Sequence, residues 1–109
     1  HMELTSITAE MYEVSKRLDQ ATRVLYKLAQ ERAETERQYR MELAKEIARL
    51  RAEGVSVTLI PDLSRGNTAD LKFHRDLADG RYRAATESLE ALKSQLSALQ
   101  SILKHQETV

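Results

Sequence analysis

Apolar residues recur at alternating steps of three and four along the first part of the chain. From Leu4 onward they are Ile7, Met11, Val14, Leu18, Ala21, Leu25 and Leu28. This heptad spacing is typical of a helix that packs against another helix along a narrow apolar seam. A chain with this pattern is constrained to bury its apolar residues between paired helices.

The spacing changes further along this segment, where no helix-breaking residue occurs. The steps from Leu28 to Tyr39 and from Tyr39 to Leu50 are each eleven residues. Such a stutter unwinds a supercoil locally without ending the helix. Residues 30–40 contain no Gly or Pro. We therefore predict one helix over residues 4–53, with Gly54 as its carboxy-terminal cap.

Residues 54–67 differ from the rest of the chain, because they hold two of the three Gly and the only Pro. Val55, Val57 and Leu59 alternate with polar residues, a pattern that predicts a short strand. Pro61 and Gly66 then predict turns. This segment is expected to be a connecting loop with a short strand.

A second heptad seam predicts a second helix over residues 68–106, with no break in phase. Its positions are Leu71, Arg75, Ala78, Tyr82, Ala85, Leu89, Leu92, Leu96, Leu99, Leu103 and Gln106. Gly80 lies within this helix, where it is expected to permit close packing or a bend.

The two helices predict an all-α fold, an antiparallel two-helix coiled-coil hairpin with a short strand-like connecting segment. Reversal of the chain at about Pro61 pairs Leu50 with Leu71 and Tyr39 with Tyr82 or Ala85. We expect the hairpin to be a single domain, with residues 1–3 as the remnant of an expression tag and the natural start.

Two arginines, Arg32 and Arg75, interrupt the apolar seams. A buried guanidinium needs a carboxylate to offset its desolvation, and Glu36, Glu46 and Asp79 are the candidates. One interpretation is that the arginines reach the edge of a narrow interface or fix its register. The other is that they hold a polar contact for a partner.

A hairpin of two helices leaves much of each seam open, so we expect a homodimer that forms a four-helix bundle. Apolar residues outside the primary seams supply the expected dimer face, which consists of Tyr12, Val24, Tyr26, Phe73, Leu77 and Ile102. The alternative is that these residues only widen the stripe within one chain.

Composition argues against several classes of function. The 17 Lys and Arg balance 17 Asp and Glu, so the surplus of positive charge typical of nucleic-acid or membrane-surface binders is missing. The chain has no Cys, and its carboxylates lie at spacings typical of surface ion pairs. His74 with Asp70 makes only two ligands. We expect no catalytic site, no cofactor and no metal, and a soluble cytoplasmic protein without membrane contact.

The loop end of the hairpin is the expected partner-binding surface. The residues that carry this prediction are Val55, Val57, Leu59, Arg65, Lys72, His74 and Arg75. They combine an apolar strand-like edge with basic side chains. Two alternatives remain open: recognition of a partner by strand addition or through the side chains of this end, and packing of the strand-like piece over the hairpin or against its dimer mate.

Residues 54–67 together with residues 69–78 resemble small uncharacterised helical-hairpin proteins encoded by phages and prophages of Gram-positive bacteria. The resemblance implies a phage setting, with the host cytoplasm as the location, where such proteins often bind host or phage proteins. The resemblance is not to secreted proteins of the WXG type, because the chain has no Trp. Nor is it to prefoldin subunits, which need β-hairpins where one short strand is predicted here.

The expected function is that of a non-enzymatic helical interaction protein, a phage-encoded adaptor or inhibitor that binds a protein of unknown identity. One alternative is a nucleic-acid-binding accessory protein of phage replication or recombination, which would use residues 72–83 on phosphates. Another is a structural or assembly coiled-coil protein.

Overall fold

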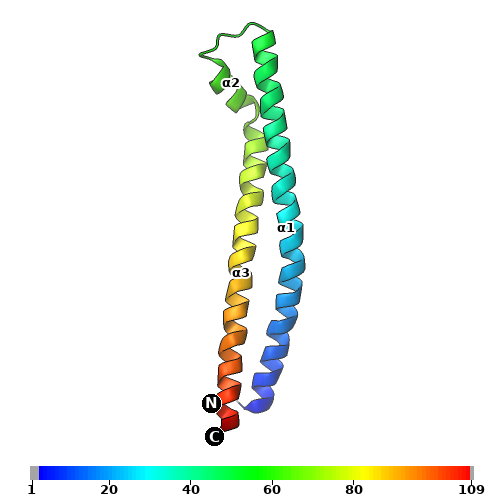
Figure 1. Cartoon of the computed structure of the whole chain (residues 1–109), viewed down its shortest axis with the longest axis vertical. Helices are drawn as coiled ribbons and strands as arrows, with labels where there is room; N and C mark the ends of the chain where they lie inside the picture. Colours follow the sequence, from blue (N-terminus) through cyan, green and yellow to red (C-terminus); the bar gives the residue numbers. More distant parts are fainter. Residues whose placement is uncertain (1–2, 109) are drawn as a thin grey trace. The chain divides into compact units, whose positions relative to one another are not determined.

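The computed structural model describes residues 3–108, and these residues form three helices and no strand. The helices are α1 (Leu4–Ala52), α2 (Ile60–Asn67) and α3 (Ala69–Thr108). The chain divides into two compact units. Residues 28–82 form the loop unit, and the remaining described residues, 3–27 and 83–108, form the terminal unit. In each unit the α1 and α3 segments run antiparallel (Figure 1). The predicted all-α helical hairpin is confirmed.

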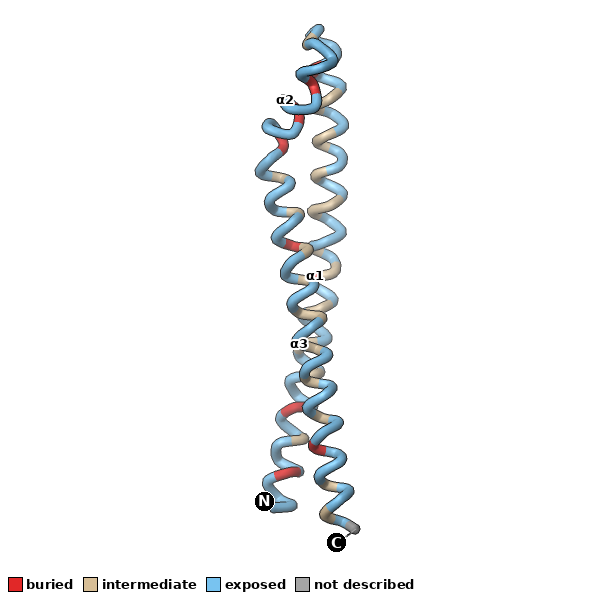
Figure 2. Tube along the Cα trace, turned by 90° about the vertical axis from the view of Figure 1, so that its left-hand side faces the viewer, coloured by how far each residue is buried: buried red, intermediate tan, exposed pale blue. Residues whose placement is uncertain are grey.

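The heptad seams mark the buried side of each helix as predicted. In the terminal unit, Ile7, Val14 and Leu99 are buried, and in the loop unit Leu28, Leu50 and Ala78 are buried. The other seam positions after Leu4 are half-buried, with Arg32 exposed. Exposed residues separate the buried ones along each helix (Figure 2). Each unit therefore has a thin core along one stripe of each helix.

A glycine cap ends α1 where the sequence predicts it. The Gly54 N–H donates to the Arg51 carbonyl at 3.1 Å, and the Val55 N–H donates to the Leu50 carbonyl at 3.1 Å. These two bonds define a Schellman motif, which needs a left-handed residue after the helix. Gly54 has a φ of 80° and provides it.

The predicted strand at Val55, Val57 and Leu59 is wrong. The N–H groups of Leu59 and Ile60 both donate to the Ser56 carbonyl, at 2.9 and 3.2 Å, and so close a turn. A short strand needs a neighbouring strand to satisfy its backbone groups, and the part of the chain that the structure describes has none. The alternation of apolar and polar residues here therefore reflects a turn.

Helix α2 replaces the turns predicted around Pro61 and Gly66. Pro61 lies in its first turn, where a missing N–H costs nothing, and Asp62 there favours the helix dipole. Ile60 and Ser64 are one turn apart and both are buried. A segment interpreted as a loop is thus a short amphipathic helix.

Thr68 joins α2 to α3. Its N–H and its hydroxyl donate to the Ser64 carbonyl, at 3.2 and 2.7 Å, and its own carbonyl accepts the Lys72 N–H at 3.1 Å. The long helices differ from the predicted bounds by one or two residues. Of the predicted start, residues 1–3, only Glu3 lies within the described residues, and its carbonyl accepts the Ile7 N–H at 3.0 Å.

The two long helices pair one heptad away from the predicted register. Prediction placed Tyr39 opposite Tyr82 or Ala85, whereas its ring lies 4.6 Å from the Arg75 guanidinium carbon. The cause is the position of the reversal, which the turn at residues 55–59 makes ahead of Pro61. Helix α2 then lies beside the last turns of α1 (Figure 1), in the place predicted for Leu71.

Candidate functional site

A groove of about 660 Å³ lies in the loop unit, between the second half of α1, helix α2 and the first turn of α3. We call it the tip groove. It is lined by Tyr39, Leu43, Ile47, Arg51, Val57, Ile60, Pro61, Ser64, Arg65 and Lys72. Its volume falls in the range of about 300–1,000 Å³ that is usual for binding pockets.

The tip groove has apolar walls and a basic rim. Leu43 and Ile47 come from the apolar seam of α1, and α2 adds Ile60. Arg51, Arg65 and Lys72 supply three cations, and none of the lining residues is acidic. An apolar ligand segment that carries negative charge is therefore the chemistry that fits the tip groove.

A polar bridge holds α2 at its place beside α1. The Asn67 Nδ2 group donates to Glu46 Oε1 at 2.7 Å, and Glu46 also pairs with Arg49. Hydrogen bonds from Arg49 and Asn67 lower the pKa of Glu46, and the pairing with Glu46 raises the pKa of Arg49. This bridge joins residues distant in sequence and so ties the end of α2 to α1.

The basic rim is only weakly neutralised. Arg65 pairs with Asp62 at 3.1 Å, and Lys72 pairs with Asp76 at 3.5 Å, with all four side chains exposed. Exposed pairs of this kind stabilise a helix by about 0.2–1 kcal/mol. Arg51 is exposed and has no ion-pair partner among residues 3–108. The rim cations are therefore available to an incoming carboxylate.

The structure divides the predicted partner-binding residues into groups. Val57, Arg65 and Lys72 line the tip groove, and Val57 is 81% exposed. Leu59 is exposed at the start of α2, while half-buried Val55 completes the cap of α1. These five residues therefore lie together at the loop end of the loop unit, and their role in partner binding stays a prediction.

The remaining two predicted residues, His74 and Arg75, serve other contacts. His74 is exposed, and its ring meets the edge of Phe73 at a centroid distance of 5.6 Å. Arg75 belongs to a polar cluster further along α3. Sequence reasoning also missed Arg51, for which the only signal was its place in the last turn of α1.

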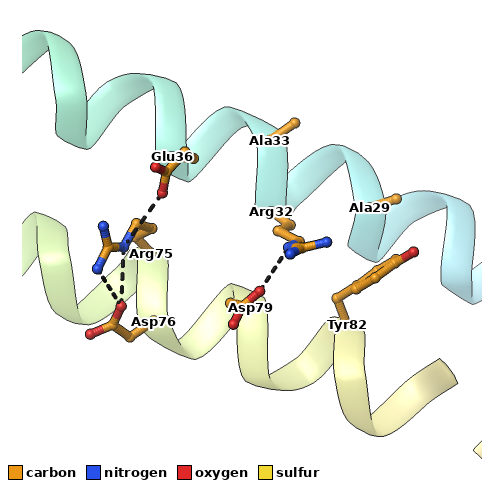
Figure 3. Close-up of a pocket in the computed structure, with 8 residues that line it drawn as sticks. All are labelled: Ala29, Arg32, Ala33, Glu36, Arg75, Asp76, Asp79 and Tyr82. Atoms are coloured by element: carbon orange, nitrogen blue, oxygen red, sulfur yellow. Dashed lines mark hydrogen bonds and ion pairs between the residues drawn. The ribbon is translucent and has the colours of Figure 1, made fainter. Parts of the chain in front are cut away.

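This polar cluster joins α1 and α3 in the loop unit, and we call it the arginine–tyrosine clasp (Figure 3). The Arg32 Nε lies 2.7 Å from Asp79 Oδ1, and the Arg32 guanidinium carbon lies 4.8 Å from the centre of the Tyr82 ring. Arg75 of α3 makes the equivalent contacts to α1: its Nε lies 3.5 Å from Glu36 Oε2, and its guanidinium stacks over the Tyr39 ring. Each helix thus gives one arginine to the other.

The clasp comes from a repeated pattern in the sequence. An arginine is followed four residues later by a carboxylate and three residues after that by a tyrosine, and the two copies are Arg32, Glu36 and Tyr39 and then Arg75, Asp79 and Tyr82. Antiparallel helices bring the two copies together in opposite directions. This repeat was the missed signal for the register of the hairpin.

The clasp is a contact between α1 and α3, and its residues other than Tyr39 line a hollow of about 550 Å³. Arg75 also bonds Asp76 at 2.8 Å, which lowers the pKa of Asp76 and raises that of Arg75. No buried side-chain polar atom among the described residues lacks a hydrogen-bond partner. Two of the three carboxylates proposed for the seam arginines, Glu36 and Asp79, therefore have that role, whereas Glu46 holds α2.

The residues of the expected dimer face are all exposed, in two separate sets. Tyr12, Val24, Tyr26 and Ile102 belong to the terminal unit, and Phe73 and Leu77 belong to the loop unit. In the terminal unit, Val24 lines a hollow that Tyr12 and Tyr26 do not. With 3.6 residues per turn, Val24 and Tyr26 project about 160° apart around the axis of α1. They do not form one flat face.

No other kind of site emerges from the described residues. None of their helices is long and apolar enough to cross a membrane. They contain no group of three or more side chains that could hold a metal ion. Comparison with known protein families, curated proteins and solved structures finds no match to the chain.

Proposed function

We propose that this chain is a non-enzymatic helical interaction protein that binds another protein through the tip groove. One observation carries the proposal: an apolar groove with a basic rim lies open beside Val57, the most exposed large apolar side chain of the described residues. Exposed apolar surface rimmed by polar groups marks interaction sites on proteins. The partner would cover Val57 and the apolar walls.

The resemblance of residues 54–67 and 69–78 to small phage proteins supports a more specific version. In that version the chain is a phage-encoded adaptor or inhibitor, and its target is a host or phage protein. The tip groove suits this role, because it combines a rigid helical framework with a concave surface at one end of the loop unit.

A protein partner fits the charges better than nucleic acid does. The chain carries 17 Lys and Arg against 17 Asp and Glu, and only three cations line the tip groove, Arg51, Arg65 and Lys72. Binding to phosphates draws its affinity from counterion release by many cations. A role in phage replication or recombination would require a salt-dependent shift with DNA or RNA, which we do not expect.

We further propose that the chain forms a homodimer, in which exposed apolar residues of the terminal unit contact a second copy. Tyr12 and Tyr26 lie two heptads apart on α1 and share one side of it. Ion-pair and apolar residues of the loop unit do not take part in this contact. The tip groove then stays open in the dimer.

A triple substitution tests the proposed function. Val57→Ser, Leu59→Ser and Arg65→Ser together remove the exposed apolar and basic groups of the tip. Serine at position 59 also favours the start of α2. We expect the variant to lose capture of a partner from a lysate of Gram-positive cells, while its circular dichroism and its mass by light scattering stay unchanged.

The matched control combines Met41→Ser with Lys27→Ser, an exposed apolar and an exposed basic residue outside the tip groove. This control is expected to capture the same partner as the unmodified chain. A triple variant that captures the partner equally well would show that the chain acts as a structural spacer, and the proposed function would be wrong.

A further inference from the structure

We propose that the tip groove binds an amphipathic helix with acidic residues beside its apolar face, supplied by a partner protein. The inference rests on the proposed function and specifies the chemistry of the partner. Three features carry it: the length of the groove along α1, the lack of a strand to extend, and the distribution of charge around the rim.

The dimensions of the tip groove favour a helical ligand. Its α1 wall extends from Tyr39 to Arg51, which corresponds to about 18 Å at 1.5 Å per residue. A helix of about three turns has the same length. The wall is itself a helix that presents Leu43 and Ile47 one turn apart. Helices recognised in grooves of this type insert apolar residues at steps of three and four.

Strand addition does not suit this end of the loop unit. It needs a free sheet edge whose backbone N–H and carbonyl groups pair with the incoming segment. The described residues contain no strand. At the turn, the Ser56 carbonyl already accepts two N–H groups. A helix satisfies its own backbone groups and needs only side-chain contacts from the tip groove.

The charges of the rim favour acidic residues in that helix. Arg51 lies at one end of the α1 wall and has no ion-pair partner in the described part of the chain. Arg65 and Lys72 have only exposed partners, so a ligand carboxylate can replace Asp62 or Asp76 at little cost. A basic ligand would instead meet three cations with no acidic residue among the lining side chains.

The experiment is a selection from a displayed library of random peptides of about 16 residues, roughly four helical turns, against the full chain. Enriched peptides are then synthesised, and their dissociation constants are measured for the unmodified chain and for three variants, Arg51→Glu, Val57→Asp and Lys27→Glu. Lys27 is an exposed cation outside the tip groove and serves as the matched control.

We expect enriched peptides with apolar residues at steps of three and four and with Asp or Glu beside them. Arg51→Glu is expected to weaken their binding about tenfold or more, since it puts like charges side by side. Lys27→Glu is expected to weaken it less than about twofold, because Lys27 does not line the tip groove.

Other outcomes separate the two proposals. One such outcome is a set of enriched peptides that are basic or neutral and yet fail to bind the Val57→Asp variant. That result would overturn the acidic helix and leave the proposed function intact. Peptides that bind the Val57→Asp variant as tightly as the unmodified chain, or a selection that enriches nothing, would overturn both proposals. A loss of the homodimer in Arg51→Glu, measured by light scattering, would show that a second copy occupies the tip groove and would overturn the acidic partner helix.

Discussion

Replacement of Arg32 and Arg75 by methionine is expected to destabilise the loop unit and to release its register. Methionine keeps an unbranched apolar stem and removes the guanidinium that stacks on tyrosine and pairs with a carboxylate. The hydrophobic seams repeat every heptad, so they alone permit a slip of seven residues. In the slipped pairing, Arg32 would face Leu89 in place of Tyr82 and would have no carboxylate opposite it.

The size of the effect follows from the exposure of the two arginines. A cation over an aromatic ring stabilises by about 0.5–1 kcal/mol when exposed and by about 2 when desolvated, and an exposed ion pair adds about 0.2–1. The Arg75 side chain is 25% exposed and that of Arg32 is 46% exposed. We therefore expect Arg75→Met to cost about 1.5 kcal/mol and Arg32→Met about 1 kcal/mol.

Urea unfolding followed by circular dichroism measures the stability, and disulfide formation measures the register. The chain has no Cys, so introduced pairs report without interference. Cysteines at Glu46 and Asn67 report the observed register, in which these side chains are hydrogen-bonded. Cysteines in place of Glu46 and His74 report the slipped register, because His74 lies seven residues after Asn67.

The two cysteine pairs are introduced in separate chains. We expect the double methionine variant to form a disulfide with either pair, and each single methionine variant to form one only between positions 46 and 67. Arg23→Met is the control, because Arg23 has an exposed ion pair with Asp19. If the double variant keeps the observed register alone and loses no more stability than Arg23→Met, the reasoning about the clasp is refuted.

Three further predictions concern stability and assembly. Gly54→Ala is expected to destabilise the chain by about 1 kcal/mol, because φ is 80° there. Gly80→Ala lies in a helix interior with open space around it, and it is expected to stabilise the chain by about 1 kcal/mol. Urea unfolding measures both changes and gives their opposite signs. Since the pKa of Glu46 is held below its ordinary value of 4.5, its ionised form favours folding above that pH and this contribution is lost as the pH falls through the lowered pKa. The melting temperature should fall less below pH 4.5 in Glu46→Gln than in the unmodified chain. Light scattering should give twice the chain mass of 12.5 kDa, and Tyr12→Ser with Tyr26→Ser should return it to the monomer.

The helices and their buried sides follow from the sequence alone. Heptad spacing requires only local geometry, so it is enough to identify positions such as Val14, Ala78 and Leu99 as core. The glycine cap at Gly54 is similarly local. Close packing at Gly80 was a wrong expectation, because no atom lies within 4 Å of the position of an added Cβ, whereas α3 continues through Gly80 as expected.

The connection and the register were not predictable from periodicity. Val55, Val57 and Leu59 alternate like a strand, but a strand depends on a partner elsewhere in the fold, and here there is none among residues 3–108. The error then propagated, because treating α2 as loop moved the reversal to Pro61. The repeat of arginine, carboxylate and tyrosine specifies the correct register. It does so only when the two helices are placed antiparallel, because each arginine then meets the carboxylate and tyrosine of the other copy.

The central claim is that the tip groove contacts a partner protein, and cross-linking at Val57 tests it most directly. A photoreactive amino acid in place of Val57, which is 81% exposed, is irradiated in a lysate, with the same replacement at Met41 as the control. We predict an adduct with one protein at Val57 alone, which excess unmodified chain removes and the triple serine variant does not. Equal adducts at both positions, or an adduct with nucleic acid, would contradict the claim.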